Sequence, residues 1–307
     1  MDRRDFLKTA AAGCATPLAR SAKRRNLKVG HTGITWVNFG PRAGKSPGSD
    51  SATIERTFEA IGGLGFYGLE LFSWQIQGME ENGGLAHYIE KYNLPLISAY
   101  GGPNLLDVAN RRQNIEDCLK WARLLKKYNG RVVTIGPNGV PRATYNFQEH
   151  KAGIIATLNE FGKGLADIGL TGCLHQHTGT CIESREETYA VLQAVDTRHV
   201  KFGPDIGQLE KGGSDPVQVV KDFLPLVNHM HLKDYSGGAE WAGYCPLGQG
   251  KVNIPAILDM MDGKKLAGMV MVELDASAGM PLPPEKSSEI AKRYLENQGV
   301  VFRSPPG

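Results

Sequence analysis

The sequence predicts an α/β fold: a single-domain (β/α)8 TIM barrel over residues 26–307, preceded by an export signal. Two observations predict it. Eight short apolar runs alternate with longer amphipathic stretches in one unbroken series, and no internal linker or low-complexity segment divides that series. An open, doubly wound sheet would also alternate strands and helices, so the count of eight units decides in favour of the barrel.

Each predicted strand is a short apolar run with β-type character. In chain order these runs cover residues 27–35, 67–73, 94–100, 131–136, 172–177, 200–205, 227–234 and 269–275. Amphipathic stretches with a helical pattern lie between them, at residues 51–65, 110–129, 150–169, 184–195 and 215–226. Residues 276–288 are Pro-rich and follow the last strand, so we expect a loop there and no domain boundary.

The opening "MDRRDFLKTAAAGCATPLA" has paired arginines followed by a short Ala-rich stretch. This pattern is typical of a twin-arginine signal, so we assign residues 1–25 to a signal peptide and linker and expect a periplasmic protein. The alternative is a disordered basic N-terminus. The apolar part is shorter than the roughly 20 residues that span a bilayer, and stable membrane insertion is not expected. Lipidation at Cys14 is not expected either, because the usual leucine is missing.

Composition excludes several classes of protein. A net charge of +3 is too weak to predict nucleic-acid binding, and 41% hydrophobic residues are enough for one large domain. Five cysteines form no spaced framework. Cys173 and Cys181 could pair in an oxidising compartment, but Cys173 lies in an apolar run and is predicted to be a buried thiol.

Polar residues gather at the ends of the predicted strands, where barrels hold their catalytic groups. In strand order they are His31, Glu70, Tyr100, His175, His177, Asp205, His231, Lys233, Asp234, Glu273 and Asp275. Strands five to eight are predicted to bring one subset to a single point, namely His175, Asp205, His231 and Glu273. Two imidazoles and two carboxylates suit Mn²⁺, Co²⁺, Zn²⁺ or Fe²⁺. Mg²⁺ would be better served by carboxylates alone, and a closed structural zinc site would be expected to contain thiolates.

Each of these residues also has a purely structural interpretation. A strand histidine is often a hydrogen-bonded core residue, Asp205 could cap a turn, and Glu273 could pair with a lysine inside the barrel. Buried carboxylates are costly without a partner, however, and four such residues on successive strand ends are hard to explain as independent accidents. We therefore predict one divalent metal ion with open positions for substrate oxygens.

At these residues the sequence resembles the xylose isomerase-like TIM-barrel superfamily of sugar phosphate isomerases and epimerases, and in motif it is most similar to inosose dehydratases. The motifs are "HQHTGT", "PDIGQLEKGGSDP", "HMHLKDY" and "PLGQGKVNIPAIL". The resemblance implies a divalent metal bound by the residues at Asp205, His231 and Glu273. Many epimerases of this group carry a glutamate at the end of strand five, where this chain has His175. A two-glutamate epimerase is therefore doubtful, and either His175 or His177 could be the ligand.

The resemblance implies a metal-dependent isomerase, epimerase or dehydratase. The metal would polarise a substrate carbonyl and stabilise an enediolate. Glu273 is the first candidate for the base, with His177 or Glu70 as alternatives. Lys233 shares a face with His231 and could stabilise an oxyanion or protonate a leaving hydroxyl. Its alternative is a structural ion pair with Asp205 or Glu70.

The predicted substrate is an unphosphorylated keto sugar or cyclitol, because the sequence shows no arginine cluster or Gly-rich phosphate loop. The predicted substrate contacts are His31, Glu70, Tyr100 and Trp241. Two alternatives remain open: a lyase that cleaves 3-keto-glycosides or C-glycosides, and a non-catalytic carbohydrate-binding barrel. An endonuclease on a similar barrel would need a basic groove, which the sequence lacks. A homo-oligomer is compatible with the resemblance, since barrels of this group are often dimers or tetramers.

Overall fold

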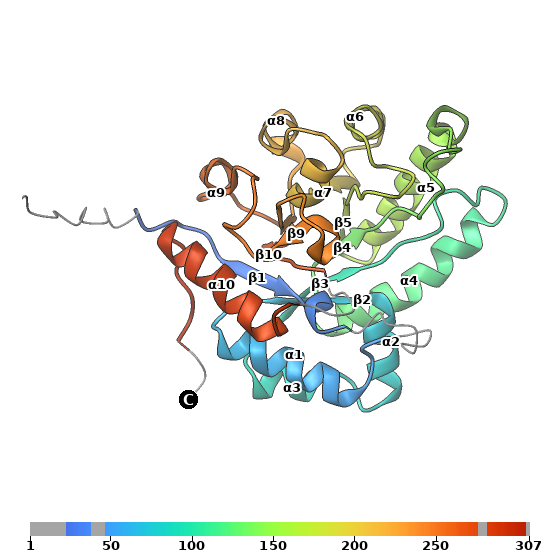
Figure 1. Ribbon diagram of the computed structural model, residues 1–307. Helices are drawn as coiled ribbons and strands as arrows, with labels where there is room; N and C mark the ends of the chain where they lie inside the picture. The colour runs from blue at the N-terminus through green and yellow to red at the C-terminus, as the bar shows by residue number, and fades with distance from the viewer. Residues whose placement is uncertain (1–22, 38–46, 276–280, 305–307) are drawn as a thin grey trace, which may run out of the picture.

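The computed structural model describes residues 23–37, 47–275 and 281–304, and its parallel strands form one curled sheet surrounded by helices (Figure 1). The strands are β1 (Val29–Thr32), β2 (Leu69–Phe72), β3 (Leu96–Tyr100), β4 (Val132–Ile135), β5 (Thr171–Leu174), β6 (Val200–Phe202), β7 (Met230–Leu232) and β10 (Val270–Val272). Their order in the sheet is β6-β5-β4-β3-β2-β1-β10-β7. The eight predicted strands are thus confirmed. Most of the predicted export signal lies outside the described residues.

The two edge strands of this sheet, β6 and β7, approach each other and nearly close the barrel. The Asn228 N–H donates to the Phe202 carbonyl at 3.0 Å, and the His231 N–H donates to the Pro204 carbonyl at 2.9 Å. Asp205 and His231 form an isolated parallel bridge beyond these bonds. Barrel closure therefore brings two of the predicted metal ligands side by side.

The five predicted helices are all present, as α1 (Ser51–Gly63), α4 (Arg111–Lys127), α5 (Phe147–Asp167), α6 (Arg185–Leu192) and α8 (Pro216–Asp222). Five more fall outside the stretches named from the sequence: α2 (Ser73–Glu81), α3 (Ala86–Lys91), α7 (Ile206–Lys211), α9 (Ile254–Met261) and α10 (Pro284–Asn297). The expected loop over residues 276–288 is wrong from Pro284 onward. Proline is tolerated in the first turn of a helix, because the N–H that it lacks would have no intrahelical partner there.

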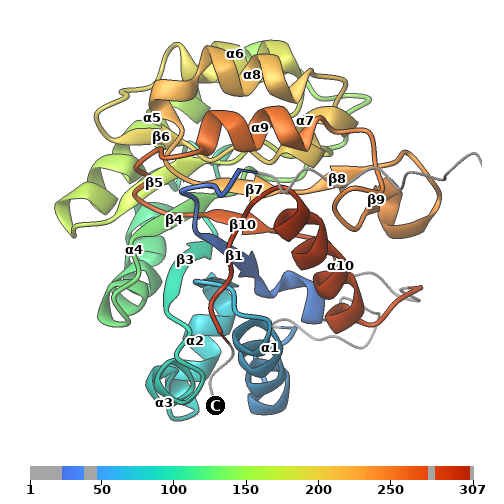
Figure 2. The same ribbon diagram turned by 90° about the vertical axis from the view of Figure 1, so that its left-hand side faces the viewer.

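Short elements complete the described fold. They are the 3-10 turns η1 (Gly33–Trp36), η2 (Leu224–Leu226) and η3 (Glu240–Gly243), and the antiparallel pair β8 (Asp234–Tyr235) and β9 (Tyr244–Cys245). Figure 2 shows β8 and β9 beyond the end of β7. Cys173 and Cys181 are both buried free thiols, so the prediction for Cys173 is confirmed. None of the described helices has the length and apolarity needed to span a membrane.

Asp234 holds the loop that follows β9. Its carboxylate accepts backbone N–H groups from Gly248 and Gly250 at 2.9 Å each and from Val252 at 3.2 Å. A Cβ at Gly250 would lie 2.2 Å from Asp234 Oδ1, so the loop can approach the carboxylate only with glycine there. Asp234 therefore anchors this loop, and its hydrogen bonds connect the "HLKD" and "PLGQG" motifs physically.

Candidate metal centre and active site

Three of the four predicted metal ligands come together at the end of the barrel. One ligand atom each from His175, Asp205 and His231 lies within 4.8 Å of the others, and all three side chains are buried. His175 directly follows β5, Asp205 precedes α7, and His231 lies in β7. Two imidazoles and a carboxylate in one buried group are a donor set suited to Zn²⁺, Mn²⁺, Co²⁺ or Fe²⁺.

Asp205 divides its two carboxylate oxygens between the helix and the site. Oδ1 accepts the N–H groups of Gly207 at 2.9 Å and Gln208 at 3.0 Å, which caps the start of α7. Oδ2 accepts no bond from the helix and lies 3.0 Å from Lys233 Nζ. The capping role considered from the sequence is therefore real, and it leaves one oxygen directed into the cluster.

His175 has the properties of a neutral ligand. Its ring is buried, and Nδ1 has no hydrogen-bond partner among the described residues. Burial, reinforced by the neighbouring His231 and His177, holds the pKa of His175 well below its usual value. A buried polar nitrogen without a partner needs an explanation, and a bound cation would supply one.

His231 lies between two carboxylates. Nε2 is 2.8 Å from Glu70 Oε1, and Nδ1 is 3.0 Å from Glu273 Oε2. Burial opposes a charge on this ring, but Glu273 and Glu70 together outweigh it and raise the pKa of His231 well above its usual value. In the absence of a cation the ring is therefore an imidazolium, and Nδ1 would have to release its proton to bind a metal.

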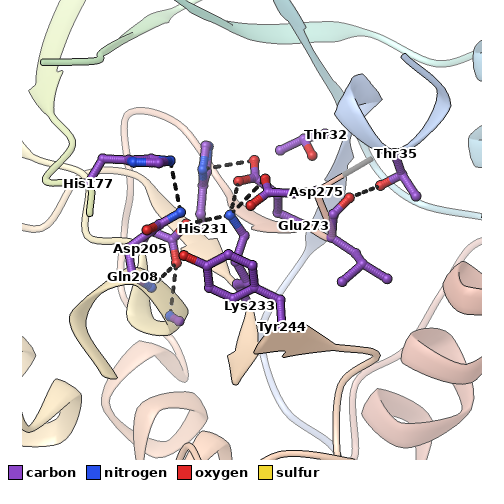
Figure 3. A network of polar contacts seen from close by, with 12 residues as sticks. Thr32, Thr35, His177, Asp205, Gln208, His231, Lys233, Tyr244, Glu273 and Asp275 are labelled. Atoms are coloured by element: carbon purple, nitrogen blue, oxygen red, sulfur yellow. Dashed lines mark hydrogen bonds and ion pairs between the residues drawn. The ribbon is translucent and has the colours of Figure 1, made fainter. Parts of the chain in front are cut away.

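Lys233 lies inside a cluster of carboxylates (Figure 3). Nζ is 2.6 Å from Glu273 Oε1, 3.0 Å from Asp205 Oδ2 and 3.0 Å from Asp275 Oδ1. Tyr244 covers it, with its ring centroid 4.8 Å from Nζ. Burial opposes the charge, but the carboxylates outweigh it and raise the pKa of Lys233 well above its usual value. The ammonium is thus charged at neutral pH.

This arrangement corrects the role expected for Lys233. The side chain is fully buried and does not line the cavity beside the cluster. The structural alternative describes it better: Lys233 pairs with Asp205, although not with Glu70. Glu273 pairs with Lys233, which is the structural alternative considered for it from the sequence. It contacts His231 but is not one of the three residues whose ligand atoms lie within 4.8 Å of one another.

A cavity of about 210 Å³ opens beside the cluster. Its lining combines apolar, aromatic and polar side chains from the ends of several strands, namely Thr32, Ile34, Glu70, Leu71, Phe72, Trp74, Tyr100, His175, His177, Glu273 and Asp275. The Phe72 and Trp74 rings stack with centroids 4.0 Å apart. Within the described part of the chain, no lysine or arginine lines this cavity. Of the predicted substrate contacts, Glu70 and Tyr100 reach it.

His177 lines the cavity in a fixed tautomeric form. Gln208 Oε1 accepts the Thr178 N–H at 3.2 Å and its hydroxyl at 2.7 Å, so the amide nitrogen of Gln208 must face His177 Nε2, 2.8 Å away. Nε2 is then the acceptor, and Nδ1 carries the proton and donates it to the Thr178 carbonyl at 2.7 Å. His177 can act as a base only after Gln208 releases this lone pair.

The structure does not bring His31 or Trp241 to the cavity. His31 Nδ1 donates to the Thr32 carbonyl at 2.7 Å, Nε2 lies 3.0 Å from Ser288 Oγ, and the ring packs edge-on against Phe66. Successive strand residues point to opposite sides, so Thr32 faces the cavity and His31 faces the helices. Trp241 is buried in a separate cluster, with Tyr244 and Leu274 among its members. Both are corrections to the predicted substrate contacts.

Sequence reasoning missed Thr32, Thr134 and Gln208. Thr134 Oγ1 donates to Glu70 at 2.8 Å inside the barrel. Alternation along the strands would have identified Thr32 had the register of β1 been known. Gln208 had a weak signal, since it stands three residues after Asp205 on the helix that Asp205 caps.

Comparison with known proteins agrees with this fold. A family model described as Xylose isomerase-like TIM barrel matches residues 58–298. An inosose dehydratase of Clostridium botulinum (strain Alaska E43 / Type E3) is 21% identical over 302 residues, which cover 90% of this chain and 98% of the relative. The resemblance read from the motifs is thereby confirmed.

Two solved structures share the fold. The probable 3-DHS dehydratase AsbF of Bacillus anthracis has a TM-score of 0.69 at 16% identity, covering 88% of this chain and 98% of that one. The IOLI protein, solved with a zinc atom, has a TM-score of 0.69 at 15% identity, covering 89% of this chain and 98% of that one. At such identities these likenesses establish the fold alone.

Proposed function

This chain belongs to the xylose isomerase-like TIM barrel family, and from that premise we propose that it is a divalent-metal-dependent dehydratase, isomerase or epimerase of an unphosphorylated keto sugar or keto-cyclitol. The observation that carries the proposal is the buried group of His175, Asp205 and His231, whose ligand atoms lie within 4.8 Å of one another beside a cavity. The inosose dehydratases among its relatives are consistent with this class of reaction.

The charges of the cluster support a cation. Four carboxyl groups adjoin only two positive side chains, Lys233 and protonated His231; the carboxyl groups are Glu70, Asp205, Glu273 and Asp275. Burial raises the pKa of Asp205 although Lys233 and His231 favour its ionised form, so a further cation would stabilise this carboxylate. Uncompensated buried charge is costly. His175, Asp205 and His231 would hold the ion, with Glu273 next to them. Such an ion, when bound, supplies Lewis-acid polarisation of a substrate carbonyl.

Two carboxylates that could move a proton lie on one side of the cavity. Glu273 and Asp275 both follow β10 and both line the cavity. Each pairs with Lys233, and Glu273 also pairs with His231. Glu70 accepts bonds from donors inside the barrel on both of its oxygens. A carboxylate from the β10 side would take the proton beside the carbonyl and could return it only from that same side. This favours dehydration or isomerisation over epimerisation between two opposed carboxylates.

The cavity lining supports a neutral substrate. A phosphate group would call for arginine, lysine or a nest of backbone N–H groups, and the described lining has no basic side chain other than its two histidines. The lining instead includes the apolar or aromatic side chains of Ile34, Phe72 and Trp74. These side chains favour one second candidate, a lyase that acts on a 3-keto-glycoside or C-glycoside. Its apolar aglycone would pack against them and would be the leaving group, where a dehydratase expels water.

The cellular location belongs to the same proposal. The twin-arginine pattern in residues 1–25 supports export to the periplasm, where unphosphorylated sugars are the expected substrates. Cell fractionation of the full chain beside a variant with both Arg3 and Arg4 replaced by lysine tests it. Retention of the variant in the cytoplasm supports export by this route, whereas equal distribution of the two proteins contradicts it.

Metal analysis is the experiment that tests the function. The purified protein, His231→Ala and Glu273→Ala are loaded with Mn²⁺, Co²⁺, Zn²⁺ or Fe²⁺ and measured by plasma mass spectrometry. We expect about one ion per chain in the parent and a large loss in His231→Ala. Solvent-deuterium exchange into keto-inositols and 3-keto-glucosides then identifies the acidified carbon. A folded parent that takes up none of these ions excludes the metal-dependent reaction.

A further inference from the structure

Glu70 is a buried carboxylate whose partners in the barrel are all neutral donors or histidines. Oε2 accepts the Thr134 hydroxyl at 2.8 Å and lies 3.0 Å from His229 Nε2, and Oε1 lies 2.8 Å from His231 Nε2. Its side chain is only 2% exposed. Burial of a carboxylate is costly unless its oxygens accept hydrogen bonds, and here both oxygens do.

The positions of the protons follow from a backbone group. Met269 N–H donates to His229 Nδ1 at 3.2 Å, so Nδ1 is the acceptor nitrogen of that ring and Nε2 must carry the proton. His229 therefore donates through Nε2 to Glu70 Oε2, beside the Thr134 hydroxyl. Oε1 is left for His231, whose Nε2 must also carry a proton because an ionised carboxylate can only accept.

We propose that Glu70 is a positioning residue that selects the nitrogen through which His231 binds the cation. By holding the proton on Nε2, Glu70 leaves Nδ1, which lies beside Glu273, as the nitrogen that can bind a cation together with Asp205 and His175. A carboxylate behind a ligating histidine fixes its ring orientation and tautomer and raises its basicity. This inference rests on the proposed metal function and assigns Glu70 a role other than substrate contact.

A second cation site is the competing interpretation, because Glu70, His229 and His231 also offer ligand atoms within 4.8 Å of one another. The hydrogen bonds argue against it. His229 has no lone pair to offer, since Nδ1 accepts from the backbone and Nε2 donates to Glu70. A cation there would need His229 to break both bonds, so we expect one ion per chain.

Glu70→Gln tests the proposal at constant shape. The glutamine amide has one acceptor oxygen. His229 Nε2 and the Thr134 hydroxyl both donate to this position, and His229 cannot change its proton because the backbone N–H of Met269 fixes its tautomer, so the amide oxygen must face them. The amide NH₂ then faces His231 Nε2 and favours the tautomer with the proton on Nδ1, which blocks the cation. We expect Zn²⁺ affinity, measured by competition with a chelator, to fall by about 10- to 100-fold. Thr134→Val is the matched control, since it removes a donor to the same carboxylate without touching His231, and it should retain parent affinity.

The tautomer itself can be read without enzyme activity. Long-range ¹H–¹⁵N spectra of the Zn²⁺-loaded parent should show His231 bound through Nδ1 and His229 protonated on Nε2. Coordination of His231 through Nε2, two Zn²⁺ ions per chain, or equal affinity in Glu70→Gln and the parent would each overturn the role of Glu70 while leaving the metal enzyme intact. A parent that binds no Zn²⁺, Mn²⁺, Co²⁺ or Fe²⁺ overturns the proposed function and this inference together. The spectra decide the matter even if Glu70→Gln does not fold.

Discussion

The ammonium of Lys233 lies 3.0 Å from Asp205 Oδ2, and both side chains are completely buried at the end of the barrel. Glu273 and Asp275 contact the same ammonium from β10. Lys233 thus acts as a fixed internal cation that holds together carboxylates from the strands on either side of β7. This relationship explains why the strand that carries His231 continues into a lysine, and it leads to the first prediction.

Lys233→Met should strongly destabilise the protein. Removal of one partner from a buried ion pair leaves uncompensated charge and typically costs about 3–5 kcal/mol in the free energy of unfolding. A divalent cation should restore part of this loss, because it would neutralise the same carboxylates and binds only the folded chain. Urea unfolding with and without Zn²⁺ measures both effects.

Lys251→Met is the control: its ion pair with Glu210 is exposed, with the two atoms 3.8 Å apart, and should contribute about 0–1 kcal/mol. Equal stability of the two variants would contradict the role of Lys233.

Gly207→Ala should disturb the same lysine from the opposite side. A Cβ at Gly207 would lie 2.7 Å from Lys233 Cγ and 2.9 Å from its Cβ, so the lysine stem or helix α7 must move. We expect a loss of about 1–3 kcal/mol, as for other overpacked cores, together with weaker metal binding because Asp205 caps that helix. Gly63→Ala serves for comparison, since nothing lies within 4 Å of its added Cβ. Thermal unfolding and Zn²⁺ titration of both variants decide this; a parent-like Gly207→Ala would show that the contact can relax.

The strand-end residues could be predicted because strand order and alternation are local properties of the sequence. The register was less secure in strands as short as β1, which has four residues, and a shift by one residue exchanges His31 with Thr32. The environment of Lys233 could not be predicted, since its three carboxylates come from the ends of two other strands and meet only after the barrel closes. The constraint on His177 depends on Gln208, which lies on a helix that the pattern did not reveal.

Metal affinity should rise with pH. Glu273 and Glu70 raise the pKa of His231 well above its usual value, so the ring is protonated at neutral pH in the absence of metal. A cation that binds Nδ1 must then displace a proton, and below the pKa of His231 the affinity should increase by about tenfold per pH unit. Calorimetric titration with Zn²⁺ in buffers of different ionisation enthalpy measures the released proton directly. Binding without proton release would mean that His231 is not a ligand.

His31 should make the fold sensitive to acid, although it lies outside the cavity. Burial lowers the pKa of His31 from 6.5 to about 4, so the folded chain holds this ring neutral while the unfolded chain protonates it near pH 6.5. Between these two values the unfolded state binds more protons, and stability therefore falls as the pH decreases through this window. The full loss is about 3 kcal/mol, from 1.36 kcal/mol per pKa unit. His31→Gln retains a donor and an acceptor near Ser288 but cannot titrate, so its stability should depend less on pH over this range. Urea unfolding of both proteins at a series of pH values measures the difference, and parallel curves would show that His31 is not the titrating group.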